Sequence, residues 1–277
     1  MKKSVSRKFS NWFLKKERSN EMKIRFLLIG VISMFFAGLL TTSSYAKIDP
    51  KTCVGMWLFD EGSGKTAKDF SGNGNDGTLM SNPKWVDGKF GKALEFDGVA
   101  SYVELPQLPG QTNQSLSFVA WIKWGGTTAT TRGVWGYTNV ATINCHFEIQ
   151  TAGMRLRLGD INKTGMTSPP ANQWASVGFT YDGSTARYYL NGTEIGNFSG
   201  NTGAIFGAES ALGHIVGVSD AGRFFDGLID EAAFFGVALA VQDIQTITNN
   251  GLKQSLGIAA VDLSGKLTTT WAFIKAR

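Results

Sequence analysis

The sequence predicts an all-β protein, in which two antiparallel sheets pack face to face as a sandwich or jelly roll, with one short helix near the C-terminal end. Roughly a dozen short apolar runs, many of them alternating with polar residues, predict the strands. Gly provides 34 of the 277 residues. Asp-Gly and Asn-Gly pairs separate several of the runs, as the two-residue turns of β-hairpins require.

Individual strands follow from local patterns. Leu116–Trp124 is apolar on both faces, which predicts a central buried strand. Tyr102–Leu105 predicts a short strand after an Asp-Gly turn. Three runs between residues 176 and 198 are joined by Asp-Gly and Asn-Gly turns, and they predict a meander.

One helix is predicted, over residues 239–250. One face of this segment carries, at helical spacing, Val241, Ile244, Ile247 and Thr248, and Gly251 is a suitable stop.

Residues 47–256 are assigned to one sandwich domain. Residues 257–277 are assigned to a tail or an appended strand.

Residues 1–46 have the pattern of an export signal. Basic residues precede an apolar run over 26–40, and Ser44-Tyr45-Ala46 ends the segment as a small-x-small cleavage site. The run is shorter than the ~20 residues of a membrane span. We expect a cleaved signal peptide, with Met22 as an alternative start and an uncleaved anchor as the alternative interpretation.

The net charge of +5 belongs to this leader, which holds nine of the 27 Lys and Arg residues and two of the 22 Asp and Glu residues. The remainder carries a net charge of −2. A surface with no surplus of positive charge does not suit nucleic-acid binding, so that partner class is excluded.

Two cysteines, Cys53 and Cys145, follow the leader. Export permits a disulfide between them. The alternative is two separate buried thiols that pack as small apolar side chains. No cysteine and histidine spacing typical of a zinc site is present.

Several motifs occur in an order that resembles the laminin-G-like, concanavalin A-like jelly-roll domains of secreted bacterial proteins. The resemblance spans about residues 54–252. Its motifs are VGMWLFDEGSG at 54–64, DFSGNGNDGT at 69–78, WVDGKFGKALEFDG at 85–98, Tyr102-Val103, Trp174, Tyr181-Asp182-Gly183, Asn191-Gly192 and GLIDE at 227–231. The resemblance implies a two-sheet sandwich whose first and last strands are neighbours, and it indicates fold better than function.

Similar domains bind calcium at glycine-rich loops, and the loop 69–77 offers oxygen ligands from Asp69, Asn73, Asn75 and Asp76. If the first and last strands are neighbours, Asp230 completes the set. A Ca²⁺ site is therefore predicted. The alternative is an ordinary turn in which Asp69 accepts hydrogen bonds from backbone N–H groups.

Catalytic patterns are weak. Glucanases of this fold place two glutamates on one strand, but the run that begins at Glu95 lacks the second glutamate. A second acidic group, at Asp226 and 230–231, is interpreted as structural or metal-related. His146 and His214, the two histidines, are interpreted as packing or hydrogen-bonding residues.

Sugar stacking requires an exposed aromatic ring. Trp135 and Tyr137, in a glycine-rich segment, are the predicted ligand-binding aromatics. The alternative is that they belong to the core.

We therefore expect an exported protein, periplasmic, cell-surface or secreted, with no membrane span after signal cleavage. Its expected function is non-catalytic binding or adhesion, with a glycan or an extracellular protein surface as partner. The alternative is a structural or assembly module that docks through residues 257–277. A glycoside hydrolase is a third hypothesis.

Overall fold

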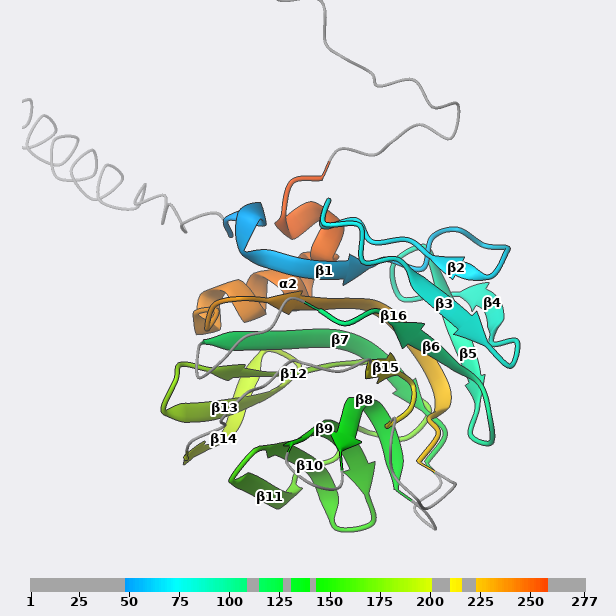
Figure 1. Ribbon diagram of the computed structural model, residues 1–277. Coiled ribbons are helices and arrows are strands. Elements are labelled where there is room, and N and C mark those ends of the chain that lie inside the picture. The colour runs from blue at the N-terminus through cyan, green and yellow to red at the C-terminus, as the bar shows by residue number, and fades with distance from the viewer. Residues whose placement is uncertain are drawn as a thin grey trace, which may run out of the picture. The chain divides into compact units, whose positions relative to one another are not determined.

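The computed structural model describes residues 48–108, 115–126, 131–139, 143–200, 210–215 and 223–258, without the side chains of 137–139, 143 and 144. These residues form two antiparallel sheets and one α-helix, α2 (Val241–Ser255). A short 3-10 helix at Pro50–Thr52 precedes the first strand. Figure 1 shows one sheet lying between α2 and the other sheet.

Sheet A contains eight strands, seven of them in one continuous order. That order is β14 (Thr193–Ser199), β13 (Thr185–Leu190), β12 (Ala175–Tyr181), β7 (Leu116–Trp124), β16 (Asp226–Phe235), β5 (Lys92–Asp97) and β4 (Lys84–Asp87). The first strand, β1 (Cys53–Trp57), pairs with β16 antiparallel. The first and last strands are therefore neighbours, as the family resemblance implies.

Sheet B also contains eight strands. Its order is β11 (Ile161–Met166), β10 (Gly153–Leu158), β9 (Ile143–Gln150), β8 (Arg132–Asn139), β15 (Ser210–Leu212), β6 (Tyr102–Leu105), β3 (Gly77–Met80) and β2 (Thr66–Ala67). Together the two sheets confirm the predicted jelly-roll sandwich.

Strand β7 is central because both of its faces are apolar. Phe118 and Ile122 point into the main core between the sheets. Val119 points the other way and joins a second apolar cluster with Ile244 and Ile247 of α2. Sheet A is thus covered on both sides, by sheet B and by the helix.

Strand β16 carries a β-bulge between Asp230 and Ala233. Glu231 adopts a φ of 44° there. The Asp230 carboxylate accepts hydrogen bonds from the backbone N–H groups of Lys89 and Phe90, both at 2.8 Å. The Glu231 carboxylate accepts one from the N–H of Leu252 at 2.7 Å. The bulge therefore attaches β16 to the β4–β5 hairpin and to α2.

Most predicted elements are confirmed, and β6 and β7 have the predicted bounds. The helix prediction needs correction, because α2 begins at Val241 and continues past Gly251 to Ser255. Gly251 has a φ of 75° and interrupts the helix where the sequence predicts a stop, and a second helical segment follows it. The extra turn forms because Leu252 is buried in the second cluster.

Candidate functional site

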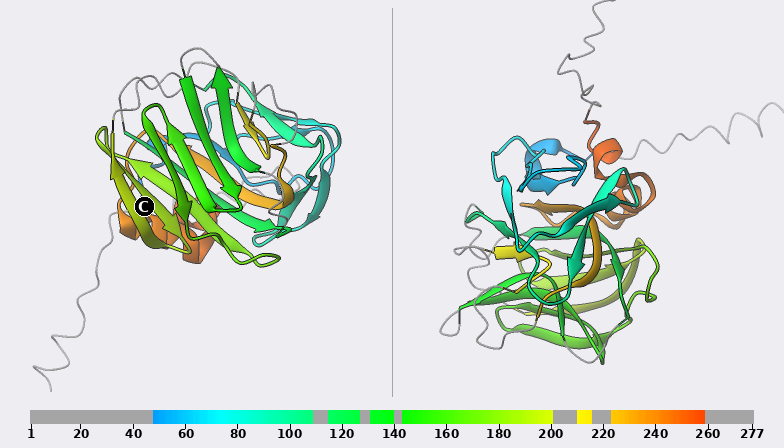
Figure 2. Two further views of the ribbon diagram at one scale, coloured as in Figure 1. Left: turned by 90° about the horizontal axis from the view of Figure 1, so that it is seen from below. Right: turned by 90° about the vertical axis from the view of Figure 1, so that its right-hand side faces the viewer.

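The outer face of sheet B carries buried charged side chains. In β9, Cys145, Phe147 and Ile149 point into the core, so His146 and Glu148 point to the opposite face. Residues paired directly across a sheet share a face, which adds side chains from β10. We call this group the charged cluster; its members are His146, Glu148, Arg155, Arg157 and Arg223. Figure 2 (left) looks from below at the side of the sandwich formed by sheet B.

Glu148 is the centre of the charged cluster. Its side chain is 0% exposed, and its carboxylate accepts hydrogen bonds from Arg155 Nη1 at 2.9 Å and Arg223 Nη1 at 3.2 Å. Gln150 Nε2 donates a further bond to it at 2.6 Å. A buried carboxylate is costly unless it is paired and hydrogen-bonded, so these partners compensate for the burial of Glu148 on this face.

His146 is 2% exposed. Among the described residues, neither ring nitrogen has a hydrogen-bond partner, although Nε2 lies 3.7 Å from Glu148 Oε1. Burial lowers the pKa of His146 to about 3, and the positive charges of Arg155, Arg223 and Arg157 act in the same direction. These effects outweigh the nearby carboxylate. A neutral imidazole with one donor and one acceptor therefore faces outward without a protein partner in the described structure.

Arg157 lies directly opposite His146 in the paired strands, and Asn162 lies opposite Arg157 in β11. Its Nε is buried and has no hydrogen-bond partner among the described residues. The neighbouring Arg155 differs, because its Nε donates to Asn162 Oδ1 at 2.9 Å.

Two glycines of β8 leave room beside these side chains. Gly136 is paired with His146, and a Cβ atom on it would overlap the His146 side chain. Gly133 is paired with Glu148, and a Cβ atom on it would come within 2.8 Å of the Arg223 carbonyl oxygen. That carbonyl accepts a hydrogen bond from the Gly133 N–H at 3.1 Å, which positions the segment carrying the Arg223 guanidinium.

An aromatic group adjoins the charged cluster in sequence, because Phe224 follows Arg223. His214 stacks on Phe224 with ring centroids 4.0 Å apart and an angle of 9°. Tyr102 lies 5.3 Å from His214 and 6.2 Å from Phe224. All three rings are half-buried, so part of each remains accessible. Aromatic faces beside polar groups are typical of sites that bind amphipathic ligands.

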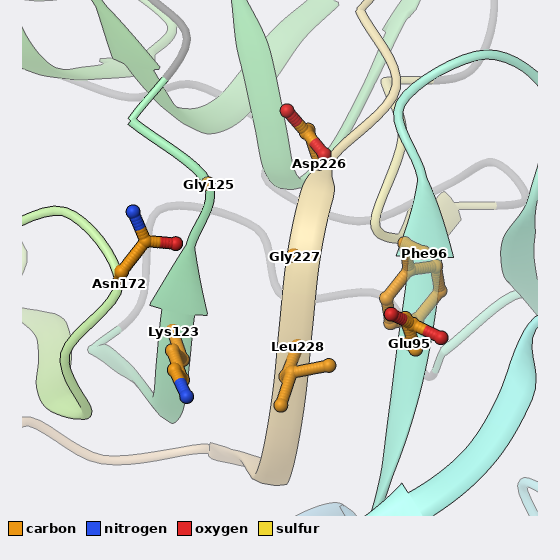
Figure 3. A pocket seen from close by; sticks show the side chains of 8 residues that line it. All are labelled: Glu95, Phe96, Lys123, Gly125, Asn172, Asp226, Gly227 and Leu228. Carbon is orange, nitrogen blue, oxygen red and sulfur yellow. The ribbon is translucent and has the colours of Figure 1, made fainter.

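A separate pocket of about 290 Å³ lies on the outer face of sheet A. It is lined by Glu95, Phe96, Lys123, Gly125, Asn172, Asp226, Gly227 and Leu228. Leu228 is paired with Glu95 on one side and with Lys123 on the other. Figure 3 shows Lys123 and Glu95 on either side of Leu228 at one end of the pocket, and Asp226 at the other end of the pocket. The structure thus brings together two acidic residues that are distant in sequence.

The predicted calcium loop is held by hydrogen bonds. Asp69 Oδ1 accepts from the N–H groups of Met56 and Ser71, at 2.9 and 2.8 Å. Asp69 Oδ2 accepts from the Asn75 N–H at 2.9 Å and the Ser71 hydroxyl at 2.8 Å. A carboxylate has about four lone-pair sites, and here all of them are occupied by protein donors.

The other predicted ligands divide between two places. Asn73 and Asn75 donate from their side-chain amides to backbone carbonyls of β1, and Asp76 Oδ1 accepts from the Asp69 N–H at 2.8 Å. Asp230 instead contacts the β4–β5 hairpin. The described geometry fits the ordinary turn, and within the described residues no group of three His, Cys, Asp or Glu side chains is arranged to hold a metal ion. Calcium binding stays a prediction of the sequence.

The predicted aromatic site needs correction. Trp135 is 0% exposed and stacks against Phe118, with ring centroids 5.8 Å apart, so its ring cannot meet a sugar. The alternation of β8 turns it into the core. The side chain of Tyr137 lies outside the described residues. Tyr102, His214 and Phe224 instead form a half-buried aromatic group.

The disulfide that export would permit is not formed between Cys53 and Cys145. Both cysteines are buried thiols. Cys53 belongs to the second apolar cluster and Cys145 to the main core, on different sides of sheet A. Burial raises the pKa of the Cys53 thiol to about 12. The alternative of two separate buried thiols is therefore the one observed.

The charged cluster was missed in sequence because its members come from three separate segments. The sequence does show that Arg155 and Arg157 alternate with apolar residues and therefore share one face of their strand. That His146 and Glu148 lie on the same face follows only from the pairing of β9 with β10.

The described part of the chain contains no helix with the length and apolarity needed to cross a membrane.

Residues 97–245 match the family model of the concanavalin A-like lectin/glucanases superfamily. A comparison with curated protein sequences gives no match.

Three solved structures share the fold at low identity. Domain 4 of AbnA, a GH43 extracellular arabinanase from Geobacillus stearothermophilus in complex with arabinotriose, is 24% identical, with a TM-score of 0.56 over 71% of this chain and 98% of that one. The binding domain of Paraclostridial Mosquitocidal Protein 1 is 16% identical, with a TM-score of 0.59 over 72% of this chain and 52% of that one. Trypanosoma rangeli sialidase in complex with sialic acid is 15% identical, with a TM-score of 0.57 over 74% of this chain and 33% of that one.

Proposed function

Because this chain belongs to the concanavalin A-like lectin/glucanase superfamily, we propose that it is an extracytoplasmic, non-catalytic module that binds glycans through the outer face of sheet B. The observation that carries the proposal is the charged cluster: a face that needed only to be stable would not bury His146 beside Glu148 with its ring nitrogens unpartnered among the described residues.

The structural relatives support a binding role at the level of the fold. One was solved with arabinotriose and another is the binding domain of a toxin. The half-buried group of Tyr102, His214 and Phe224 supplies flat apolar surface for a sugar ring, and the arginines beside it supply donors for hydroxyl oxygens.

The test is retention of the full chain on a panel of immobilised glycans. We expect Phe224→Ala to weaken retention at least tenfold. Phe90→Ala is the matched control, because Phe90 is also a half-buried ring with an edge contact, to Trp121, but lies in the β4–β5 hairpin of sheet A. Absence of retention across the panel, or equal losses in both variants, contradicts the proposal.

The extracytoplasmic location rests on the leader pattern in residues 1–46. We expect the chain in the exported fraction of its host with Lys47 as its first residue, as read by N-terminal sequencing. A cytoplasmic chain that retains the leader contradicts this part of the proposal.

Glycoside hydrolysis is a second candidate function, favoured by one observation: Glu95 and Asp226 line the same pocket. Retaining and inverting glycosidases both use two carboxyl groups. Release of reducing ends from a bound glycan, lost in Glu95→Gln, supports catalysis. Binding without turnover supports the non-catalytic proposal.

An assembly role is less well supported by the described residues, among which Val99 is the single exposed large apolar side chain. Stable protein interfaces have an apolar centre, which one such residue does not provide. The predicted docking segment lies almost entirely outside the described residues.

A further inference from the structure

The charged cluster carries more positive than negative charge. It contains three guanidinium groups and one carboxylate, and its histidine is neutral because burial and the arginines lower its pKa. The surplus contrasts with the net charge of −2 carried by the chain after residue 46. Along the row of paired residues that the structure describes, the next carboxylate is Glu104 of β6, which is separated from His146 by two strands, β8 and β15.

Glu148 does not occupy the donors of all three arginines. A guanidinium presents five N–H donors. Glu148 accepts from one nitrogen of Arg155 and one of Arg223, and no described residue bonds Arg157 Nε. Planar, paired donors of this kind match the two oxygens of a carboxylate.

His146 is a buried, neutral neighbour of Arg157. Its ring is 2% exposed and adds no charge to this part of the face. Arg157 lies directly opposite His146 on the adjacent strand, with the two Cβ atoms about 5 Å apart in a typical sheet. The positive charge of Arg157 therefore stands beside a neutral side chain, and a carboxylate is the ligand group that its planar donors match.

We propose that the outer face of sheet B binds a carboxylate-bearing sugar, such as a uronic or sialic acid residue of a glycan. Arg157 binds the sugar carboxylate, His146 lies buried beside it, and Glu148 is a positioning residue that holds Arg155 and Arg223. The inference rests on the proposed function and specifies its ligand class.

The experiment compares glycans that differ in the carboxyl group alone. The full chain is titrated with oligosaccharides of galacturonate, glucuronate and N-acetylneuraminate, each beside its carboxyl-reduced form, and with a sulfated glycan of similar charge. We expect at least tenfold tighter binding of one carboxylated form than of its reduced partner. The sulfated glycan distinguishes carboxylate recognition from general attraction to anions.

Variants then assign the preference to the site. We expect Arg157→Gln to remove the preference for the carboxylated form, and Arg157→Lys to retain part of it, since it keeps the charge without the planar fork. Arg187→Gln is the matched control, because Arg187 pairs with Asp182 in sheet A, away from the charged cluster. Thermal melts confirm that each variant is folded.

The outcomes separate the two proposals. Equal affinity for the carboxylated and reduced forms overturns the inference and leaves glycan binding standing. Equal affinity for sulfated and carboxylated glycans, or a preference that survives in Arg157→Gln, also overturns it. Binding to no glycan overturns both.

Discussion

The outer faces of the two sheets are built from different chemistry. On sheet A, Val119 and Ala233 pack under Ile244, Ile247 and Leu252 of α2, and the face is closed by apolar contact. On sheet B, the equivalent alternate positions of β9 and β10 carry charged side chains, and no described α-helix packs over them.

Both faces bury carboxylates, but they satisfy them differently. Asp230 and Glu231 accept hydrogen bonds from backbone N–H groups of neighbouring segments, so they connect parts of the fold. Glu148 accepts from arginine side chains that are 15% and 21% exposed. Carboxylates bonded to backbone N–H groups connect segments of the fold, whereas Glu148 is bonded to partly exposed cationic side chains and fixes their positions on the face.

The largest expected effect is on the helix-covered face. Ile247 is 1% exposed, so Ile247→Ala should lower the free energy of unfolding by about 2–4 kcal/mol through lost burial and a residual cavity. Denaturant titration measures it. Asn249→Ala, on the exposed side of α2, is the control and should change stability by less than ~0.5 kcal/mol. Unchanged glycan binding in both variants would sharpen the contrast between the faces.

The next effect is acid sensitivity on sheet B. The pKa of His146 is about 3 in the folded protein, against 6.5 ordinarily, so the unfolded chain gains a proton first as the pH falls. Relative to wild type, His146→Gln should therefore gain about 2 kcal/mol of stability between pH 7.5 and pH 5. Urea titrations at both pH values measure the difference. A constant difference would mean that His146 charges readily in the folded state.

Sheet A should show the opposite pH dependence of the free energy of unfolding. Burial raises the pKa of Asp230 to about 8, so the folded protein holds a proton that the unfolded chain has lost, and stability falls as the pH rises toward 8. Between pH 7 and pH 8.5 the contribution of Asp230 to this loss should be about 1 kcal/mol. Asp230→Asn should remove it and leave the smaller loss from Glu231, whose pKa burial raises to about 7. Parallel pH profiles for the two proteins would contradict the interpretation of Asp230.

The smallest expected effect concerns calcium. Because protein donors occupy the lone-pair sites of Asp69, excess calcium should shift the melting temperature by less than about one degree relative to chelator. A shift of several degrees that disappears in Asp69→Asn would instead confirm the predicted calcium site and would require the loop to rearrange. Asp182→Asn, in another turn of sheet A, is the control.

Local pattern predicted much of the fold and less of the site. The run at Leu116–Trp124 predicted a strand buried on both faces because strand alternation is a property of the chain itself. Gly251 was interpreted as a helix stop and does interrupt the helix, but the further helical segment that buries Leu252 was not predicted. Trp135 was assigned to ligand binding, but it lies in the core. Which face of its strand is buried depends on how the two sheets pack, and the local sequence does not record this.

By itself, the sequence determined the strand and turn pattern and the amphipathic helix, because short-range periodicity and glycine turns encode these locally. Its ordered motifs also resembled the family, which the family model then matched. The tertiary structure alone decided which side chains meet. Arg157 faces His146 only through the register of β9 and β10, and Arg223 reaches Glu148 from 75 residues away. Long-range pairing sets such contacts, and no local pattern in the chain records them.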